Sequence, residues 1–128
     1  MDTQQLNDLS HKIIGAAIEV HDILGPGLYE QTYHAAMIQE LKLRGIKAES
    51  EVPIPFIYKG TTLNLAYRAD IIVEDEIILE LKSTESNSNL HCKQLLTYLR
   101  LTDKRLGLLI NFNKSYVTEG IHRVANKL

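Results

Sequence analysis

Two adjacent segments with alternating side chains, joined by a short acidic turn, constrain the fold of this chain more than any other feature. The segments lie in predicted strands over residues 63–73 and 76–83, and Glu74-Asp75-Glu76 forms the turn. Strand side chains alternate between the two faces of a sheet. One face of the pair carries only apolar side chains: Ala69, Ile71, Val73, Ile77, Leu79 and Leu81. The pattern therefore predicts a β-hairpin with one face buried in a core.

The length of the turn decides which side chains meet across this hairpin. With three residues in the turn, Val73 pairs with Ile77 and Asp70 lies opposite Glu80. A turn of two residues would place the two carboxylates on opposite faces. The uniform apolar face favours the longer turn, so we expect Asp70, Glu80 and Lys82 to lie together on the other face.

Two carboxylates and a lysine in a sheet are costly unless they are paired or bound to a metal. Divalent cations such as Mg²⁺ prefer carboxylate oxygens, completed by water and substrate phosphate. A metal at Asp70 and Glu80 would polarise a phosphate and lower the pKa of an attacking water, and Lys82 would position that water or stabilise developing charge. The spacing equally allows a solvated ladder of ion pairs, in which Asp70 or Glu80 pairs with Lys82 and Arg68.

The rest of the chain alternates helical and extended patterns. The predicted helices cover residues 6–24, 28–44 and 90–102. The further predicted strands cover residues 47–58, 105–112 and 121–125, with Pro53 and Pro55 suited to an edge or a bulge in the first. This order predicts an α/β fold with a mixed central sheet of four or five strands flanked by helices, in one domain over residues 1–128.

Composition excludes several classes of protein. With 14 basic and 16 acidic residues, the net charge of −2 argues against coating nucleic acid by charge alone, although a bound cation can reverse the local field. Cys92 is the only cysteine, which excludes an internal disulfide and a cysteine-based zinc site. We find neither a signal-peptide pattern nor an apolar run near the roughly 20 residues of a membrane span, and expect a cytoplasmic protein.

Motifs distributed along the whole chain resemble one family. Gly27-Leu28-Tyr29-Glu30-Gln31-Thr32-Tyr33 matches the signature of the GxxExxY proteins. Further segments resemble that family in the same order: residues 13–21, 24–27, 58–60, 68–70, 80–82, 94–98 and 107–112. The family is grouped with the PD-(D/E)XK nucleases, so the resemblance implies a mixed sheet flanked by helices, the restriction-endonuclease-like core.

The resemblance also implies roles for single residues. Asp70 resembles the first metal carboxylate of the superfamily, Glu80 and Lys82 resemble its Glu-x-Lys pair, and Glu30 resembles its upstream acid on a helix. It thus implies a catalytic set of Asp70, Glu80 and Lys82, and metal ligands Glu30, Asp70 and Glu80. Ala69 stands where the motif has proline.

A second group of residues is expected to orient the substrate or the site. Gln94 and Tyr98 resemble the Gln-x-x-x-Tyr element of the RecB-like branch, and their spacing places them on one helical face. That face points either toward the site or toward water. Arg68 is expected to contact phosphate or to pair with Asp70, and the ion pair is favoured.

Two functions follow from these expectations. The leading hypothesis is a nuclease that needs Mg²⁺ or Mn²⁺ and hydrolyses phosphodiester bonds in DNA, or in RNA. The alternative is a non-catalytic module that keeps the nuclease fold and binds nucleic acid or a protein partner. A homodimer or an assembly subunit is a third interpretation.

Overall fold

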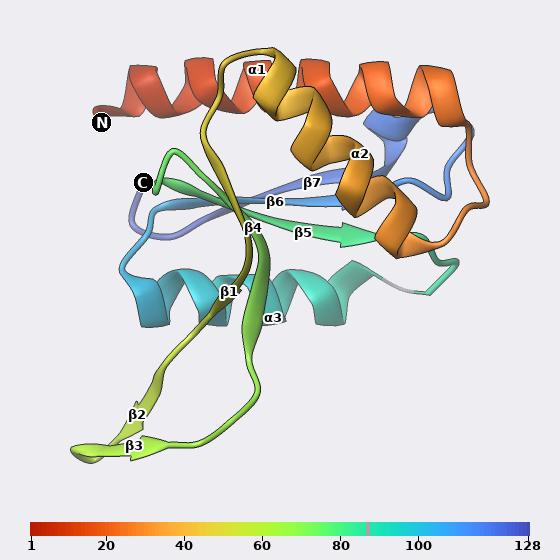
Figure 1. Cartoon of the computed structure of the whole chain (residues 1–128). Coiled ribbons are helices and arrows are strands. Elements are labelled where there is room, and N and C mark those ends of the chain that lie inside the picture. Colours follow the sequence, from red (N-terminus) through yellow and green to blue (C-terminus); the bar gives the residue numbers. More distant parts are fainter. Residues whose placement is uncertain (87) are drawn as a thin grey trace.

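A computed structural model describes residues 1–86 and 88–128 of the chain (Figure 1). The helices are α1 (Thr3–Leu24), α2 (Glu30–Leu43), α3 (Ser88–Thr102) and a short 3-10 helix, η1 (Val117–Gly120). The strands are β1 (Ala48–Pro53), β2 (Phe56–Tyr58), β3 (Thr61–Leu63), β4 (Arg68–Val73), β5 (Ile77–Lys82), β6 (Leu106–Asn111) and β7 (Ile121–Ala125). No helix in this described part of the chain is both long and apolar enough to cross a bilayer.

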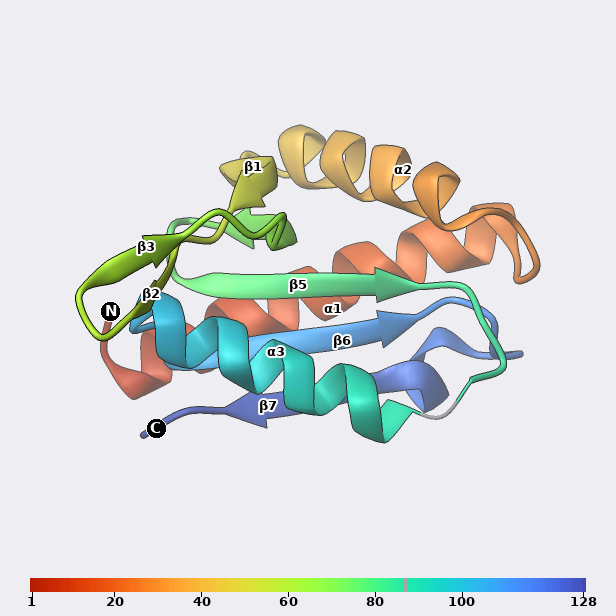
Figure 2. The ribbon, with the colours of Figure 1, turned by 90° about the horizontal axis from the view of Figure 1, so that it is seen from below.

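The central sheet has five strands in the order β1-β4-β5-β6-β7. Strands β5 and β6 are parallel and the other neighbours are antiparallel, so the sheet is mixed. Helices α1 and α2 lie on one face and α3 lies on the other (Figures 1 and 2). The predicted α/β fold with a mixed central sheet is therefore confirmed, with five strands.

Each face of the sheet has its own core. The core under α1 and α2 contains the apolar side chains of the central hairpin together with Tyr33, Met37 and Leu41 of α2. The core under α3 contains side chains from the opposite face of the same strands, such as Ile72 and Ile78. The face predicted to carry the charged residues is therefore partly covered by α3.

Ala69 is the exception to the predicted apolar face, because it packs in the core on the α3 side, with Ile54. The β4–β5 ladder ends at the pair Ile71–Leu79, so Ala69 lies where β4 has left regular pairing with β5. Ala69 is still paired with Val52 of β1, and Val52 packs against the same core on the α3 side.

The predicted strand over residues 47–58 is interrupted at its prolines, and the predicted strand over residues 63–73 is too long. The first is divided into β1 and β2, whereas the second corresponds to β4 alone, because β3 ends at Leu63 and residues 64–67 lie outside any strand. β2 and β3 pair only with each other, closed by a turn in which Lys59 and Gly60 have positive φ. Pro53 and Pro55 cannot donate to a ladder, and the pairing of β1 with β4 ends at Pro53 opposite Arg68. This β2–β3 arm projects away from the sheet, past α3 (Figure 1).

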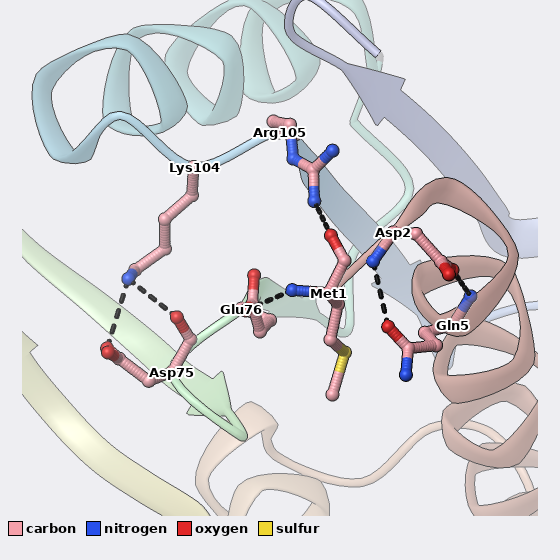
Figure 3. A network of polar contacts seen from close by, with 7 residues as sticks. All are labelled: Met1, Asp2, Gln5, Asp75, Glu76, Lys104 and Arg105. Carbon is pink, nitrogen blue, oxygen red and sulfur yellow. Dashed lines mark hydrogen bonds and ion pairs between the residues drawn. The ribbon is translucent and has the colours of Figure 1, made fainter.

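A network of polar contacts ties together the end of the sheet that lies away from Lys82 (Figure 3). Lys104, before β6, donates from Nζ to the carbonyl and carboxylate oxygens of Asp75, at 2.9 and 3.0 Å. The amino group of Met1 lies 3.3 Å from Glu76 Oε1, and Arg105 donates to the Met1 carbonyl. These contacts fix the β4–β5 turn against α1 and β6, and so hold the register of the hairpin.

Candidate active site

The candidate site forms where β4 and β5 separate. Their ladder pairs Val73 with Ile77, which confirms the predicted turn of three residues. The ladder ends two pairs further along, one residue before Asp70 would pair with Glu80. The Leu81 amide donates instead to Asp70 Oδ2 at 2.8 Å. A carboxylate thus replaces a backbone carbonyl as the partner of β5, and Asp70 is held against the strand that carries Glu80.

Glu80 is the most unusual ionisable group in this site. It is 7% exposed, and Oε1 is the one buried side-chain polar atom among the described residues without a hydrogen-bond partner. Burial, followed by the hydrogen bond with Asp70 and the charge of Asp70, raises its pKa to about 10, while Lys82 opposes this shift. An unpaired buried oxygen beside a second carboxylate is an environment that a bound cation would relieve.

Lys82 lies at the end of β5 and is half-buried. Its charge lowers the pKa of Glu80 and that of Glu30, partly offsetting the effect of burial at each. Burial and the charge of Lys82 together lower the pKa of the nearby His91 imidazole. One ammonium group therefore acts on carboxylates from both β5 and α2.

The alternative of a solvated ion-pair ladder is wrong. No ion pair between described residues involves Asp70, Glu80, Lys82 or Arg68. Arg68 is exposed and forms no pair with Asp70 among the described residues, while Asp70 accepts a hydrogen bond from the Leu81 amide. The charged residues of the hairpin are thus not explained by mutual pairing.

The start of α2 is brought beside the end of β5 by two short connections. Ser83 Oγ, just after β5, donates to the Leu28 carbonyl at 2.6 Å. The Tyr33 hydroxyl accepts from the Leu28 amide at 3.2 Å and also contacts the Gly25 carbonyl, which fixes the turn between α1 and α2. Glu30, the first residue of α2, is therefore held near the site.

Glu30 lies at the rim rather than inside the site. Burial raises the pKa of its carboxyl, Lys82 lowers it, and the Asp70 charge raises it. Glu30 and Asp70 line one hollow of about 450 Å³. Within the described part of the chain, no three His, Cys, Asp or Glu side chains converge closely enough to hold a metal by themselves. The role of Glu30 as a metal ligand therefore stays a prediction.

The same hollow contains two residues that the sequence analysis missed, His34 and Glu51. His34 Nε2 lies 2.6 Å from Ser50 Oγ, and its Nδ1 lies 3.9 Å from Glu51 Oε1. His34 follows Glu30 by four residues and so shares its helical face, which is a signal that the sequence did contain. Glu51 reaches the hollow only through the path of β1, which the sequence does not reveal.

Gln94 and Tyr98 lie four residues apart on α3, which covers the sheet face opposite α1 and α2 (Figure 1). Gln94 Nε2 donates to the Tyr98 hydroxyl at 2.9 Å. Tyr98 is 4% exposed, and burial followed by the charge of Glu80 raises its pKa, with a smaller contribution from Asp70. Tyr98 is thus buried where the charge of Glu80 acts on it, whereas Gln94 is exposed. Tyr98 also packs with Leu95 and Leu99 in the core under α3.

Close packing of α3 on the sheet depends on one glycine. Gly107 lies in β6, and a Cβ atom there would lie 2.9 Å from Leu95 Cδ1. Glycine at this position lets α3 approach the sheet, and Tyr98, one turn after Leu95, thereby comes near Glu80.

The mixed sheet with a carboxylate pair at the point where two strands separate, followed by Glu-x-Lys on β5, defines a class of domain. The chain belongs to the PD-(D/E)XK nuclease superfamily, because a family model of that description matches residues 7–124. Members of this superfamily generally use divalent metals. Assignment to the GxxExxY family stays a prediction.

One solved structure supports the fold. The chain is similar to the crystal structure of SSO0001, with a TM-score of 0.55 and 24% sequence identity. The match covers 77% of this chain and 51% of that one, so this chain corresponds to about half of SSO0001. At this identity the likeness concerns the fold alone. No curated protein gives a significant match.

The residues present fit a divalent cation. Mg²⁺ is usually held by one or two carboxylates, with water and substrate phosphate as the other ligands. Asp70 and Glu80 are in contact and Glu80 Oε1 has no partner, so the pair offers oxygen ligands that the protein itself leaves unsatisfied. The raised pKa of Glu80 shows that this arrangement is unfavourable for the ionised pair without a cation.

Proposed function

We propose that this protein is a divalent-metal-dependent nuclease that hydrolyses phosphodiester bonds in DNA. The observation that carries the proposal is the buried, unpartnered Oε1 of Glu80 in contact with Asp70. A purely structural carboxylate would find a donor, since almost all buried polar groups in proteins are hydrogen-bonded. Family membership makes nucleic acid the expected substrate.

Asp70 and Glu80 would hold the metal, and Glu30 would contribute from the rim of the hollow. When bound, the metal would polarise the phosphate and lower the pKa of the attacking water. Lys82, half-buried and without an ion pair among the described residues, would position that water or stabilise charge on the phosphate.

The remaining predicted residues have supporting roles in this proposal. The hydroxyl of Tyr98, held by Gln94, would orient the Glu80 side of the site. The exposed Arg68 would contact substrate phosphate. We propose Mg²⁺ or Mn²⁺ as the metal, DNA ahead of RNA as substrate, and one domain formed by residues 1–128.

Metal binding by calorimetry tests the carboxylate pair. We expect Mg²⁺ or Mn²⁺ to bind the wild type in the presence of a short uncleavable oligonucleotide, and binding to be lost in Asp70→Asn. Asp22→Asn, at an exposed position on α1, is the control and should bind as the wild type does. Absence of metal binding with and without the oligonucleotide would contradict the proposal and favour the non-catalytic binding module.

A further inference from the structure

A groove of about 400 Å³ runs between the β2–β3 arm and α3. Phe56 and Tyr67 line it from the side of the arm, and Lys93, Gln94 and Tyr98 line it from α3. Lys93 is the one charged residue among those that the structure places along the groove. The arm and α3 lie next to each other in both views of the ribbon (Figures 1 and 2).

Aromatic rings connect this groove to the candidate active site. The ring centroids of Phe56 and Tyr67 are 5.9 Å apart, with an angle of 36° between the ring planes. The rings of Tyr67 and Tyr98 are also 5.9 Å apart, at 62° in an edge arrangement. Tyr98 packs under α3 in one core with Ile78, which precedes Glu80 by two residues and so lies on the same face of β5. A molecule in the groove would therefore lie next to the reacting phosphate.

The groove and the neighbouring arm carry several large apolar side chains that are exposed. Tyr67 is 38% exposed despite its contacts with two rings. On the arm, Ile57 and Tyr58 are 60% and 57% exposed, and Leu90 at the start of α3 is 71% exposed. Contiguous exposed apolar side chains of this kind mark binding surfaces.

We infer that the groove binds an unpaired nucleobase next to the scissile phosphate, with Tyr67 as the stacking platform and Lys93 facing the backbone. The substrate is thus single-stranded, or has a single-stranded stretch at the site of cleavage. This inference rests on the proposed nuclease function and specifies its substrate class. Bases of a duplex are stacked on each other and are not available to a protein ring, whereas unpaired bases stack on aromatic side chains.

Charge favours the same substrate. The chain has a net charge of −2, so it lacks the cation excess on which binding of duplex phosphates depends. Stacking on aromatic rings supplies affinity for single strands with fewer cations. Lys93 on α3 places one positive charge along the groove, where it can face a phosphate of the backbone.

The test measures binding of a fluorescently labelled oligothymidylate by anisotropy in EDTA, where no hydrolysis occurs. We expect tighter binding to the single strand than to a matched duplex or to a strand with abasic sites. Tyr67→Leu should weaken binding at least about fivefold, within the range for loss of one stacked base. Tyr67→Phe keeps the ring and should bind as the wild type does. Tyr116→Leu, at a 71% exposed tyrosine before η1, is the matched control.

A second variant keeps the inference testable if Tyr67→Leu misfolds. Lys93→Ala, at an exposed position of α3, should reduce the slope of log affinity against log salt by about 0.7, the value for one lost contact with a single-strand phosphate. Equal binding of the abasic strand, or no effect of either variant, would overturn the inference. Sedimentation showing a dimer that Tyr67→Leu dissociates would also overturn it, because a second copy would then occupy the groove.

These outcomes are distinguishable from failure of the proposed function. Metal-dependent cleavage that requires Asp70 but does not depend on Tyr67 would refute binding of a base in the groove and leave the nuclease proposal intact. Binding that depends on Tyr67, without any cleavage in Mg²⁺ or Mn²⁺, would support the groove and refute the nuclease.

Discussion

Replacing Glu80 by glutamine should stabilise the metal-free protein, and the gain should grow with pH. Glutamine has the shape of protonated glutamic acid, so it can keep the contact with Asp70. Because glutamine is neutral at every pH, no free energy is spent on keeping a buried carboxyl protonated. In the unfolded chain the carboxyl has an ordinary pKa of 4.5, whereas in the folded protein its pKa is about 10. Between these values the folded state binds one proton more than the unfolded state.

This difference in the number of bound protons fixes the sign and the slope of the free energy of unfolding against pH. The contribution of Glu80 is fully present below pH 4.5 and is lost as the pH rises toward 10. The free energy of unfolding of the wild type should therefore fall by about 1.4 kcal/mol per pH unit because of this residue. Between pH 6 and pH 8 the advantage of Glu80→Gln should grow by about 2.7 kcal/mol. The slope requires only that the folded pKa exceed the pH range used.

Urea unfolding in EDTA at several pH values between 6 and 8 measures this effect. The control is Glu49→Gln, an exposed glutamate on β1, whose pH profile should run parallel to that of the wild type. The reasoning is refuted if Glu80→Gln also runs parallel to the wild type, because Glu80 would then be ionised in the folded protein.

Three further outcomes are expected. Metal binding near pH 7 should release about one proton from Glu80, so its affinity should rise with pH; calorimetry in buffers of different ionisation enthalpy measures this release, and a proton count of zero would contradict it. Lys82→Met should keep metal binding and lower the rate of cleavage about 100-fold or more in a single-turnover assay, and an unchanged rate would remove Lys82 from the mechanism. Gly120→Ala places a Cβ 2.2 Å from the Asn111 carbonyl oxygen and should lower the free energy of unfolding in urea by about 1–3 kcal/mol or more. Gly15→Ala, in α1 and close only to the Arg44 guanidinium, should raise it by up to about 1 kcal/mol. Equal effects of the two substitutions would contradict the packing at η1.

The central hairpin could be predicted from sequence because its physics is local. A period of two, an acidic turn and one apolar face fix the register, and Val73 pairs with Ile77 as expected. The three helices follow from periodic apolar residues and lie within a few residues of the predicted ranges. The predicted strands over residues 105–112 and 121–125 correspond to β6 and β7.

Features that depend on tertiary contacts could not be predicted. Where β4 separates from β5, the Leu81 amide donates to the Asp70 carboxylate instead of a backbone carbonyl, and no local sequence pattern encodes this hydrogen bond. The ring contacts of Tyr67 with Phe56 and Tyr98 require the β2–β3 arm to fold beside α3 (Figure 2). The sequence offered the prolines that divide the strands, but not the direction in which the arm leaves the sheet.

Cleavage of end-labelled DNA, single-stranded and duplex, by the wild type and Asp70→Asn tests the central claim most directly. The Asn variant keeps an oxygen for the Leu81 amide and should stay folded. We predict cleavage by the wild type in Mg²⁺ or Mn²⁺, none in EDTA, and none by Asp70→Asn. Absence of cleavage by the wild type, or equal cleavage by the folded variant, would contradict a metal-dependent site at Asp70 and Glu80.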